Sequence, residues 1–390
     1  MSPFVETNNR LDCRVPASLS DPATDGSAPV GSDAGTRGKE YEGGHTVRIR
    51  QFNAAVNLEA LQAFASELRS QPCIVSPGFS VGQHNLVRKI TFRDGVNWIA
   101  RLKMPPMEGE PSTADATLNM QSELATMEFV SYAKREGIQR TVIPIPKVHA
   151  YNLDGGHPVG CSFSIMDYVN GNTAEEVSSQ YGGGHEGVPI QFREKFWRQM
   201  AEIAIQLASI RMPAIGCIVW DPADQHSFVV GPLTETGSGP YASAAAFYAD
   251  YPLVLDRKLA NGSEPVDGQG EVVKTFRSLA ASFPPPAAGT VEAGLAGNFG
   301  LANFDLNPNN VLVDREFNVL AVIDWDSVAA VPDAALYRFP FLMGLSYAIP
   351  GVVEEHPAEK NRQLCGLQFA AVVEAVAVEM RRKYGEGVYK

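Results

Sequence analysis

The most chemically informative stretch of the sequence carries two aspartates and an asparagine at fixed spacing. Asn310 follows Asp305 by five residues, and Asp324 stands directly after an apolar run. Transfer of a phosphoryl group from a nucleoside triphosphate needs a carboxylate that orients the acceptor hydroxyl and oxygen ligands that hold magnesium against the phosphates. Magnesium binds few protein carboxylates and keeps phosphate and water oxygens as its other ligands. These residue types therefore predict a Mg²⁺-dependent phosphoryl-transfer site.

Two short strands must bring these residues together. Two short strand-like segments, Asn310–Val313 and Val319–Ile323, lie on either side of a polar turn, which is typical of a β-hairpin. A hairpin would return Asp324 to the loop that carries Asp305. Taken singly, such residues are also common loop-capping and turn-forming residues. Their joint spacing favours the functional interpretation.

Two motifs in this stretch resemble those of the aminoglycoside phosphotransferase and choline kinase family. They are DLNPNN at residues 305–310 and VIDWD at residues 322–326. The resemblance implies that Asp305 is the catalytic base and that Asn310 and Asp324 are the magnesium ligands. It also gives Asp326 a contact in the second layer around the metal or with the substrate.

The sequence departs from the family pattern just before Asp305. Asn303 stands where the family has a histidine, and Phe304 replaces a glycine. That histidine braces the catalytic loop through hydrogen bonds, and an asparagine amide can do part of this. The departure leaves open a catalytically degenerate nucleotide-binding protein, or an enzyme that uses the same cleft for other chemistry.

The resemblance extends over about residues 50–380 and implies a nucleotide site in the first half of the chain. Gly82 and Asn85 lie in GQHNLV, which is similar to the family's nucleotide loop. Arg101 stands where the family keeps a cation that binds the ATP phosphates, and Glu123 matches the carboxylate that orients that cation. Gly82 and Asn85 could instead form only a hairpin turn. Arg101 and Glu123 could instead be ordinary surface charges on a strand and a helix.

The segment SFSIMDYVNG resembles the family's hinge between two lobes. The resemblance implies that the backbone carbonyl of Asp167 and the N–H of Val169 bind adenine. ATP and Mg²⁺ are therefore the implied cofactors, and the implied reaction is transfer of the γ-phosphoryl group to a hydroxyl of a small molecule.

Hydrophobic periodicity predicts an α+β chain. Asp94-Gly95 between two apolar runs is a strong hairpin signal. The spacing of apolar residues predicts helices over residues 58–68, 118–134, 192–210 and 363–383. Two further segments, 142–152 and 162–169, are predicted to be strands.

With the resemblance, this pattern predicts a bilobal protein kinase-like fold with ATP between the lobes. We expect a flexible leader over residues 1–46, a small five-stranded antiparallel β-sheet lobe over 47–168 and a mainly helical lobe over 169–390.

The composition of the chain limits the classes of partner that the protein is expected to bind. The chain has 390 residues and a formal net charge of −12, which disfavours nucleic acid and anionic membranes and suits a cationic small-molecule substrate. There is no apolar run long enough for a membrane span and no secretory signal, so we expect a cytoplasmic location. The five cysteines are odd in number and widely spaced, which argues against a disulfide framework or structural zinc.

Overall fold

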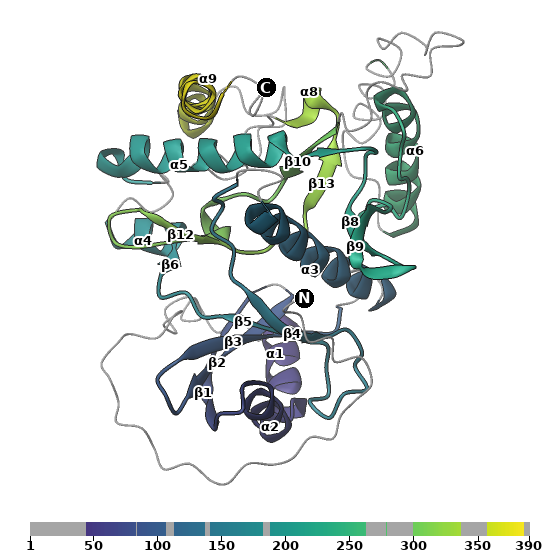
Figure 1. Cartoon of the computed structure of the whole chain (residues 1–390), viewed down its shortest axis with the longest axis vertical. Coiled ribbons are helices and arrows are strands. Elements are labelled where there is room, and N and C mark those ends of the chain that lie inside the picture. The colour runs from purple at the N-terminus through teal and green to yellow at the C-terminus, as the bar shows by residue number, and fades with distance from the viewer. Residues whose placement is uncertain are drawn as a thin grey trace. The chain divides into compact units, whose positions relative to one another are not determined.

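The computed structural model describes residues 44–82, 84–106, 113–136, 141–181, 188–262, 278, 299–336 and 357–385. The chain divides into two compact units (Figure 1). The first comprises residues up to Thr117 together with Pro146–Asn172, and the second comprises Leu118–Ile145 and the chain from Thr173 onward. The domain limits predicted from the sequence remain a prediction. Most of the predicted leader lies outside the described residues, and its last three residues begin the first helix, α1.

The first unit is built on a five-stranded antiparallel sheet, as the sequence predicts. Its strand order is β1-β2-β3-β5-β4. Along β2 and β3, buried positions alternate with partly exposed ones, because successive side chains point to opposite faces of a strand. The strands are β1 (Cys73–Val81), β2 (Asn85–Phe92), β3 (Asn97–Lys103), β4 (Val148–Asn152) and β5 (Phe163–Asp167). The strand expected over 142–152 begins only at Val148, because Pro144 and Pro146 cannot donate to a strand ladder.

Two helices, α1 (Gly44–Ala55) and α2 (Leu58–Arg69), pack on this sheet (Figure 1). Asn57 begins α2 as its N-cap, since its side chain accepts a hydrogen bond from Ala60 N–H at 3.0 Å. Leu61 and Phe64 of α2 join the core formed by inward-facing residues of the strands. The helix predicted over 58–68 is thus confirmed, and it supplies the hydrophobic cover of one sheet face.

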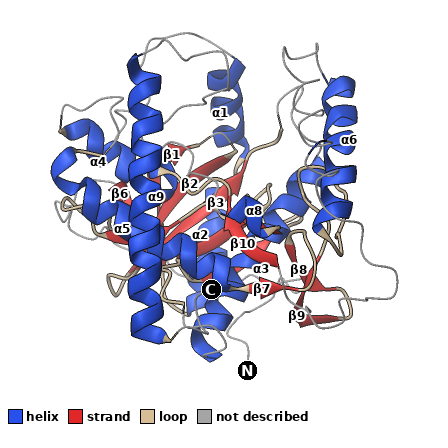
Figure 2. Ribbon diagram, turned by 90° about the horizontal axis from the view of Figure 1, so that it is seen from above, coloured by secondary structure: helices blue, strands red, loops and turns tan. Residues whose placement is uncertain are grey.

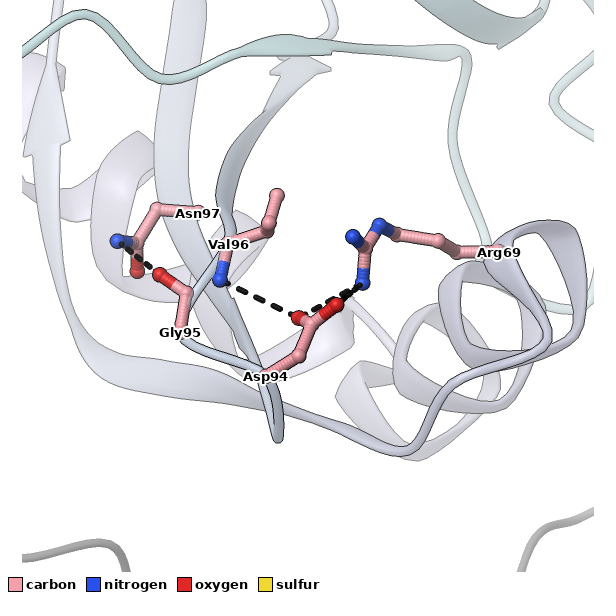
Figure 3. A network of polar contacts seen from close by, with 5 residues as sticks. All are labelled: Arg69, Asp94, Gly95, Val96 and Asn97. Carbon is pink, nitrogen blue, oxygen red and sulfur yellow. Dashed lines mark hydrogen bonds and ion pairs between the residues drawn. The ribbon is translucent and has the colours of Figure 1, made fainter.

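The Asp94-Gly95 turn joins β2 to β3, as predicted. Gly95 has φ 85°, a left-handed conformation that glycine adopts at low cost. Figure 3 shows Asp94 pointing at Arg69 of α2, with an N–O distance of 2.7 Å, and accepting a hydrogen bond from Val96 N–H. Asn97 Nδ2 donates to the Gly95 carbonyl at 3.2 Å. The turn is thereby fixed both internally and to α2.

The second unit is mainly helical. Its helices are α3 (Thr113–Glu136, from Leu118 onward), α4 (Ala174–Gln180), α5 (Ile190–Ser209), α6 (Ala244–Gly262), α8 (Asp333–Leu336) and α9 (Pro357–Tyr384). Helix α9 crosses over α5 (Figures 1 and 2). An ion pair between Arg198 and Glu379 and an edge-on ring contact between Trp197 and Phe369 join them. The helices predicted over 118–134, 192–210 and 363–383 are confirmed. So is the α+β class, with an antiparallel sheet first and a helical part after it.

Short strands in the second unit carry the loops. Residues 299–331 contribute β10 (Phe299–Asn303), β11 (Val311–Val313), β12 (Val319–Val322) and β13 (Val328–Val331). The others are β6 (Asn172–Thr173, of which Thr173 belongs to this unit), β7 (Arg211–Met212), β8 (Ile218–Asp221) and β9 (Asp224–Val230). They form the orders β13-β10-β7, β12-β11-β6 and β8-β9. The hairpin predicted over 310–323 is present as β11 and β12, except that Asn310 ends a 3₁₀ turn instead of starting a strand.

No helix in the described ranges is long and apolar enough to cross a membrane. Cys73, Cys161 and Cys217 are buried free thiols, and burial raises the pKa of Cys161 to about 12.

Candidate active site

The loop after β10 holds Asp305 and Asn310 against each other. Asn310 Nδ2 donates to Asp305 Oδ2 at 2.6 Å and to the Asp305 carbonyl at 2.9 Å. Asn310 is only 8% exposed, because it ends the 3₁₀ turn Pro308–Asn310 and lies directly before the buried strand β11. The five-residue spacing therefore closes a loop in which the amide orients the carboxylate.

Asn307 is a third member of this loop and was not predicted from the sequence. Its Nδ2 donates to Asp305 Oδ1 at 2.7 Å, and its Oδ1 accepts from Asn309 N–H at 2.8 Å. Side chains of asparagine commonly bond to backbone two residues on, so the Asn-Pro-Asn run was the available signal. Each oxygen of the Asp305 carboxylate thus receives one amide donor.

Asn303 braces the same loop from the end of β10. Its Oδ1 accepts a hydrogen bond from Asp305 N–H at 2.9 Å. Its Nδ2 is buried and has no hydrogen-bond partner in the described part of the chain. The residue that replaces the family histidine therefore keeps a hydrogen bond to the Asp305 loop.

Asp324 returns to this loop from β12. The N–H of Ile323 donates to the Asn310 carbonyl at 2.9 Å, which joins the two ends of the hairpin. Burial raises the pKa of Asp305 above its ordinary value, and the negative charge of Asp324 raises it further against the hydrogen bonds from Asn310 and Asn307. The two carboxylates therefore repel each other electrostatically. Asp324 itself has φ 61°, which is uncommon for a residue other than glycine.

The residue after Asp324 is tied to helix α3. The Trp325 backbone N–H donates to Glu123 Oε1 at 3.3 Å, and its indole Nε1 donates to the Val322 carbonyl at 3.0 Å. Trp325 is fully buried and Glu123 is 7% exposed. Asp326 accepts a hydrogen bond from its neighbour Ser327 at 3.1 Å. Glu123 thus supports the strand end that presents Asp324.

The far end of the hairpin is anchored separately on α5. Phe317, at the turn, is fully buried and stacks on Phe192 with ring centroids 5.1 Å apart. Gln199 bonds both sides of the turn, donating to the Phe317 carbonyl at 2.9 Å and accepting from Val319 N–H at 2.8 Å. The hairpin is therefore held at its turn by packing and at its open end by the Asp305 loop.

The oxygen atoms of this loop fit a magnesium ion. Asp324 supplies carboxylate oxygens and Asn310 supplies an amide oxygen, which is the donor chemistry that Mg²⁺ prefers. Since the Nδ2 of Asn310 is bonded to Asp305, its Oδ1 is the atom left to meet a cation.

In the first unit, the predicted nucleotide residues lie on the sheet. Gly82 and Asn85 form the β1–β2 turn, where Gly82 N–H donates to the Asn85 carbonyl at 2.9 Å. Arg101 lies on β3, paired with Val87 and Ser164 of the neighbouring strands. Because Glu123 belongs to the other unit, pairing of Arg101 with Glu123 remains a prediction.

Asp167 and Val169 lie at and just beyond the end of β5. The Asp167 N–H donates to the Lys147 carbonyl at 2.9 Å, and its carboxylate accepts from Lys147 N–H at 3.2 Å. Among the described residues, no acceptor is bonded to Val169 N–H, although its carbonyl accepts from Gly171. The segment keeps the backbone donor that adenine binding would use, and this role remains a prediction.

Several known proteins are similar to this chain. A putative fructosamine-3-kinase from Thermobifida fusca YX-ER1 is 14% identical, with 83% of this chain and 93% of that chain covered and a TM-score of 0.41. The macrolide 2'-phosphotransferase MphH from Brachybacterium faecium is 12% identical, with 85% and 95% covered and a TM-score of 0.38. An ethanolamine kinase from Plasmodium vivax is 12% identical, with 76% and 66% covered and a TM-score of 0.35. No curated protein matches the chain.

Family membership comes instead from a family model. The model described as "Phosphotransferase enzyme family" matches residues 77–330, more than half of the chain. The matched span runs from the nucleotide loop predicted in β1 and β2 through the Asp305 loop to β13. The predicted family and enzyme class are thus confirmed: the chain belongs to the phosphotransferase enzyme family.

Proposed function

We propose that this phosphotransferase moves the γ-phosphoryl group of ATP to a hydroxyl group of a small molecule, with Mg²⁺ as its metal. The observation that carries the proposal is the Asp305–Asn310 contact at 2.6 Å, beside which the charge of Asp324 raises the pKa of Asp305. One carboxylate oriented by amides beside a second carboxylate and an amide oxygen is the arrangement that phosphoryl transfer uses.

Asp305 would act as the catalytic base. As the acceptor oxygen bonds to the γ-phosphorus, the bond to the ADP oxygen breaks and the hydroxyl proton passes to the Asp305 carboxylate. The hydrogen bonds from Asn307 and Asn310 fix the orientation of that carboxylate. Burial and the charge of Asp324 raise its pKa, which makes it a better proton acceptor than an exposed aspartate.

Asn310 and Asp324 would hold the metal, which when bound neutralises phosphate charge. The other predicted contacts belong to the nucleotide: Gly82 and Asn85 at the phosphate loop, Arg101 at the phosphates with Glu123 orienting it. Asp167 and Val169 would bind adenine through their backbone.

The acceptor is proposed to be small because the segment after Asp324 leads quickly into the next strand and helix. Strand β13 begins at Val328 and α8 at Asp333, so within the described residues 324–336 no segment has the length that a protein substrate would need for docking. The net charge of −12 supports a cationic acceptor such as an amine. The Asn303 hydrogen bond to Asp305 supports an active enzyme over a degenerate one. A cytoplasmic location fits this proposal and remains a prediction.

The nucleotide site can be tested by thermal unfolding with and without millimolar ATP and Mg²⁺. A ligand that binds only the folded state adds about 2.7 kcal/mol at a hundredfold excess over its Kd. We expect a Mg²⁺-dependent rise in Tm for the wild type that is lost in Asp324→Asn. Glu316→Gln, an exposed change on the same hairpin, should behave as the wild type. No rise in the wild type would contradict the proposal.

The chemical step is tested by ADP release with a panel of hydroxylated amines. Asp305→Asn should lower kcat by roughly 10²- to 10⁴-fold, the usual loss when a general base is removed. Its Mg²⁺- and ATP-dependent rise in Tm should remain. Turnover that is unchanged by Asp305→Asn would exclude Asp305 as the base.

A further inference from the structure

A buried arginine stands at a core-facing position of β2. Arg88 lies between Leu86 and Ile90 in the alternating pattern of that strand, where the other inward residues are apolar. It is only 2% exposed. A charge is costly to bury and is retained only where specific hydrogen bonds compensate it. The position therefore calls for an explanation.

The guanidinium is bonded to two backbone carbonyls of β1. Arg88 Nη1 donates to the Ser76 carbonyl at 3.1 Å and to the Pro77 carbonyl. The register of β1 against β2 shifts here, since Val75 pairs with Ile90 while Phe79 pairs with Arg88 itself. Residues 76–78 thus form a bulge, and Arg88 supplies donors for carbonyls that the irregular ladder leaves out.

Two further contacts fix the guanidinium. Nη2 donates to Asn53 Oδ1 of α1, and the guanidinium carbon lies 4.9 Å from the centroid of the Phe79 ring. Within the described residues, all its hydrogen-bond acceptors are neutral, and burial lowers its pKa. Asn53 precedes the span that the family model matches.

The bulge opens the loop predicted to meet the phosphates. Residues 76–78 lie on β1 and end four positions before Gly82, and Asn85 begins β2 three positions before Arg88. Bulges redirect a strand, so the carbonyls that Arg88 holds set the direction in which the loop leaves β1.

We propose that Arg88 is a positioning residue for the nucleotide loop, fixing the bulge at Ser76 and Pro77 against Asn53 of α1 so that the loop backbone meets the polyphosphate of ATP. The inference rests on the proposed function. It predicts that Arg88 contributes to recognition of the phosphates and not to recognition of the nucleoside.

The test compares ATP with adenosine as ligands, measured by titration calorimetry in Mg²⁺ buffer. Arg88→Met keeps the side-chain length and removes every donor, and it should weaken ATP binding roughly tenfold while changing adenosine binding less than about twofold. Arg88→Lys keeps the charge but not the planar guanidinium, and its affinity for ATP should lie between those of the wild type and Arg88→Met. Arg93→Met removes the same charge from an exposed position after β2 and should bind both ligands as the wild type does.

Equal losses for ATP and adenosine in Arg88→Met would overturn the inference, because a general structural role acts on both ligands. Unchanged ATP binding in a folded Arg88→Met protein would overturn it too. If Arg88→Met does not fold, Asn53→Ala decides: a selective loss of ATP affinity supports the inference, and no selective loss overturns it. A wild type that binds neither ligand would overturn the proposed function together with the inference, whereas failure of the selectivity alone leaves the proposed function standing.

Discussion

The imidazole Nε2 of His149 lies 2.7 Å from Oδ1 of Asp167, which bonds β4 to the end of β5. The same ring stacks on Trp98 with centroids 3.9 Å apart. Burial alone would raise the pKa of Asp167, but the hydrogen bonds from His149 and Lys147 N–H lower it below its ordinary value. The carboxylate is therefore held in its charged form at the residue whose backbone carbonyl is predicted to bind adenine.

Removing the His149 donor should weaken ATP binding without slowing chemistry. His149→Phe keeps the stack on Trp98 and loses the hydrogen bond, and His149→Gln keeps a donor and loses the stack. We expect the KM for ATP to rise about threefold to tenfold in His149→Phe, with kcat unchanged and a smaller effect in His149→Gln. Steady-state kinetics measure this, with exposed His226→Phe as the control. An equal rise in the KM for the acceptor would argue against a role at the adenine segment.

Asn303→Ala should lower kcat, because it removes the acceptor for Asp305 N–H. Loss of one such hydrogen bond corresponds to a decrease of roughly threefold to tenfold. Asn303→His restores the family residue and should retain more activity than the alanine variant. Asn309→Ala, an exposed change in the same loop, is the matched control. Full activity in Asn303→Ala would show that the loop is held without this bond.

Gly300→Ala should destabilise the second unit. A Cβ at Gly300 would lie 2.5 Å from the Ala208 carbonyl oxygen and 2.8 Å from a methyl carbon of Leu336. Overpacking of this kind costs about 1–3 kcal/mol. Gly155→Ala adds the same methyl group in open space and should leave stability unchanged. Urea denaturation compares the two variants, and equal midpoints would contradict the predicted clash.

His157 should make stability depend on pH. Burial lowers its pKa below 6.5, although the charge of Asp154 opposes this. Its Nδ1 accepts from Val159 N–H at 3.1 Å, and its buried Nε2 has no hydrogen-bond partner within the described ranges. The folded state therefore binds fewer protons than the unfolded state, so the free energy of unfolding falls as pH drops below about 6.5.

The comparison variant is His157→Asn, which keeps an acceptor for Val159 N–H and does not titrate. Urea midpoints measured between pH 7.5 and 5 should fall less in this variant than in the wild type. Identical pH profiles would assign the pH dependence to other groups.

Local sequence signals predicted the elements whose patterns are complete within one segment. Asp94-Gly95 marked the β2–β3 hairpin, and the spacing of Leu61 and Phe64 marked α2. The strand β10 carries no comparable signal, because its sequence FGLAN is short and its partners, β7 and β13, are distant along the chain. This strand forms because it pairs with segments that are distant in the sequence, so local periodicity could not predict it.

For the site, residue type and spacing identified Asp305, Asn310 and Asp324 but not the residues that orient them. Asn307 reads as a loop asparagine until its two contacts are seen. Arg88 could have been noticed as a charge at an inward position of an alternating strand, yet the bulge that it binds is a tertiary feature. Glu123 was predicted for its pairing with Arg101, and its bond to Trp325 N–H could not be foreseen from spacing.

Because the β11–β12 hairpin is anchored at its turn by Phe317 and Gln199, its two ends serve different purposes. The turn contributes to folding, and the open end contributes to activity. Substitutions near the turn would lower the yield of folded protein, while substitutions at the open end would lower turnover in protein that still accumulates. In a library of random variants measured for both abundance and activity, substitutions at the turn should therefore reduce abundance. Substitutions at the open end should reduce activity alone.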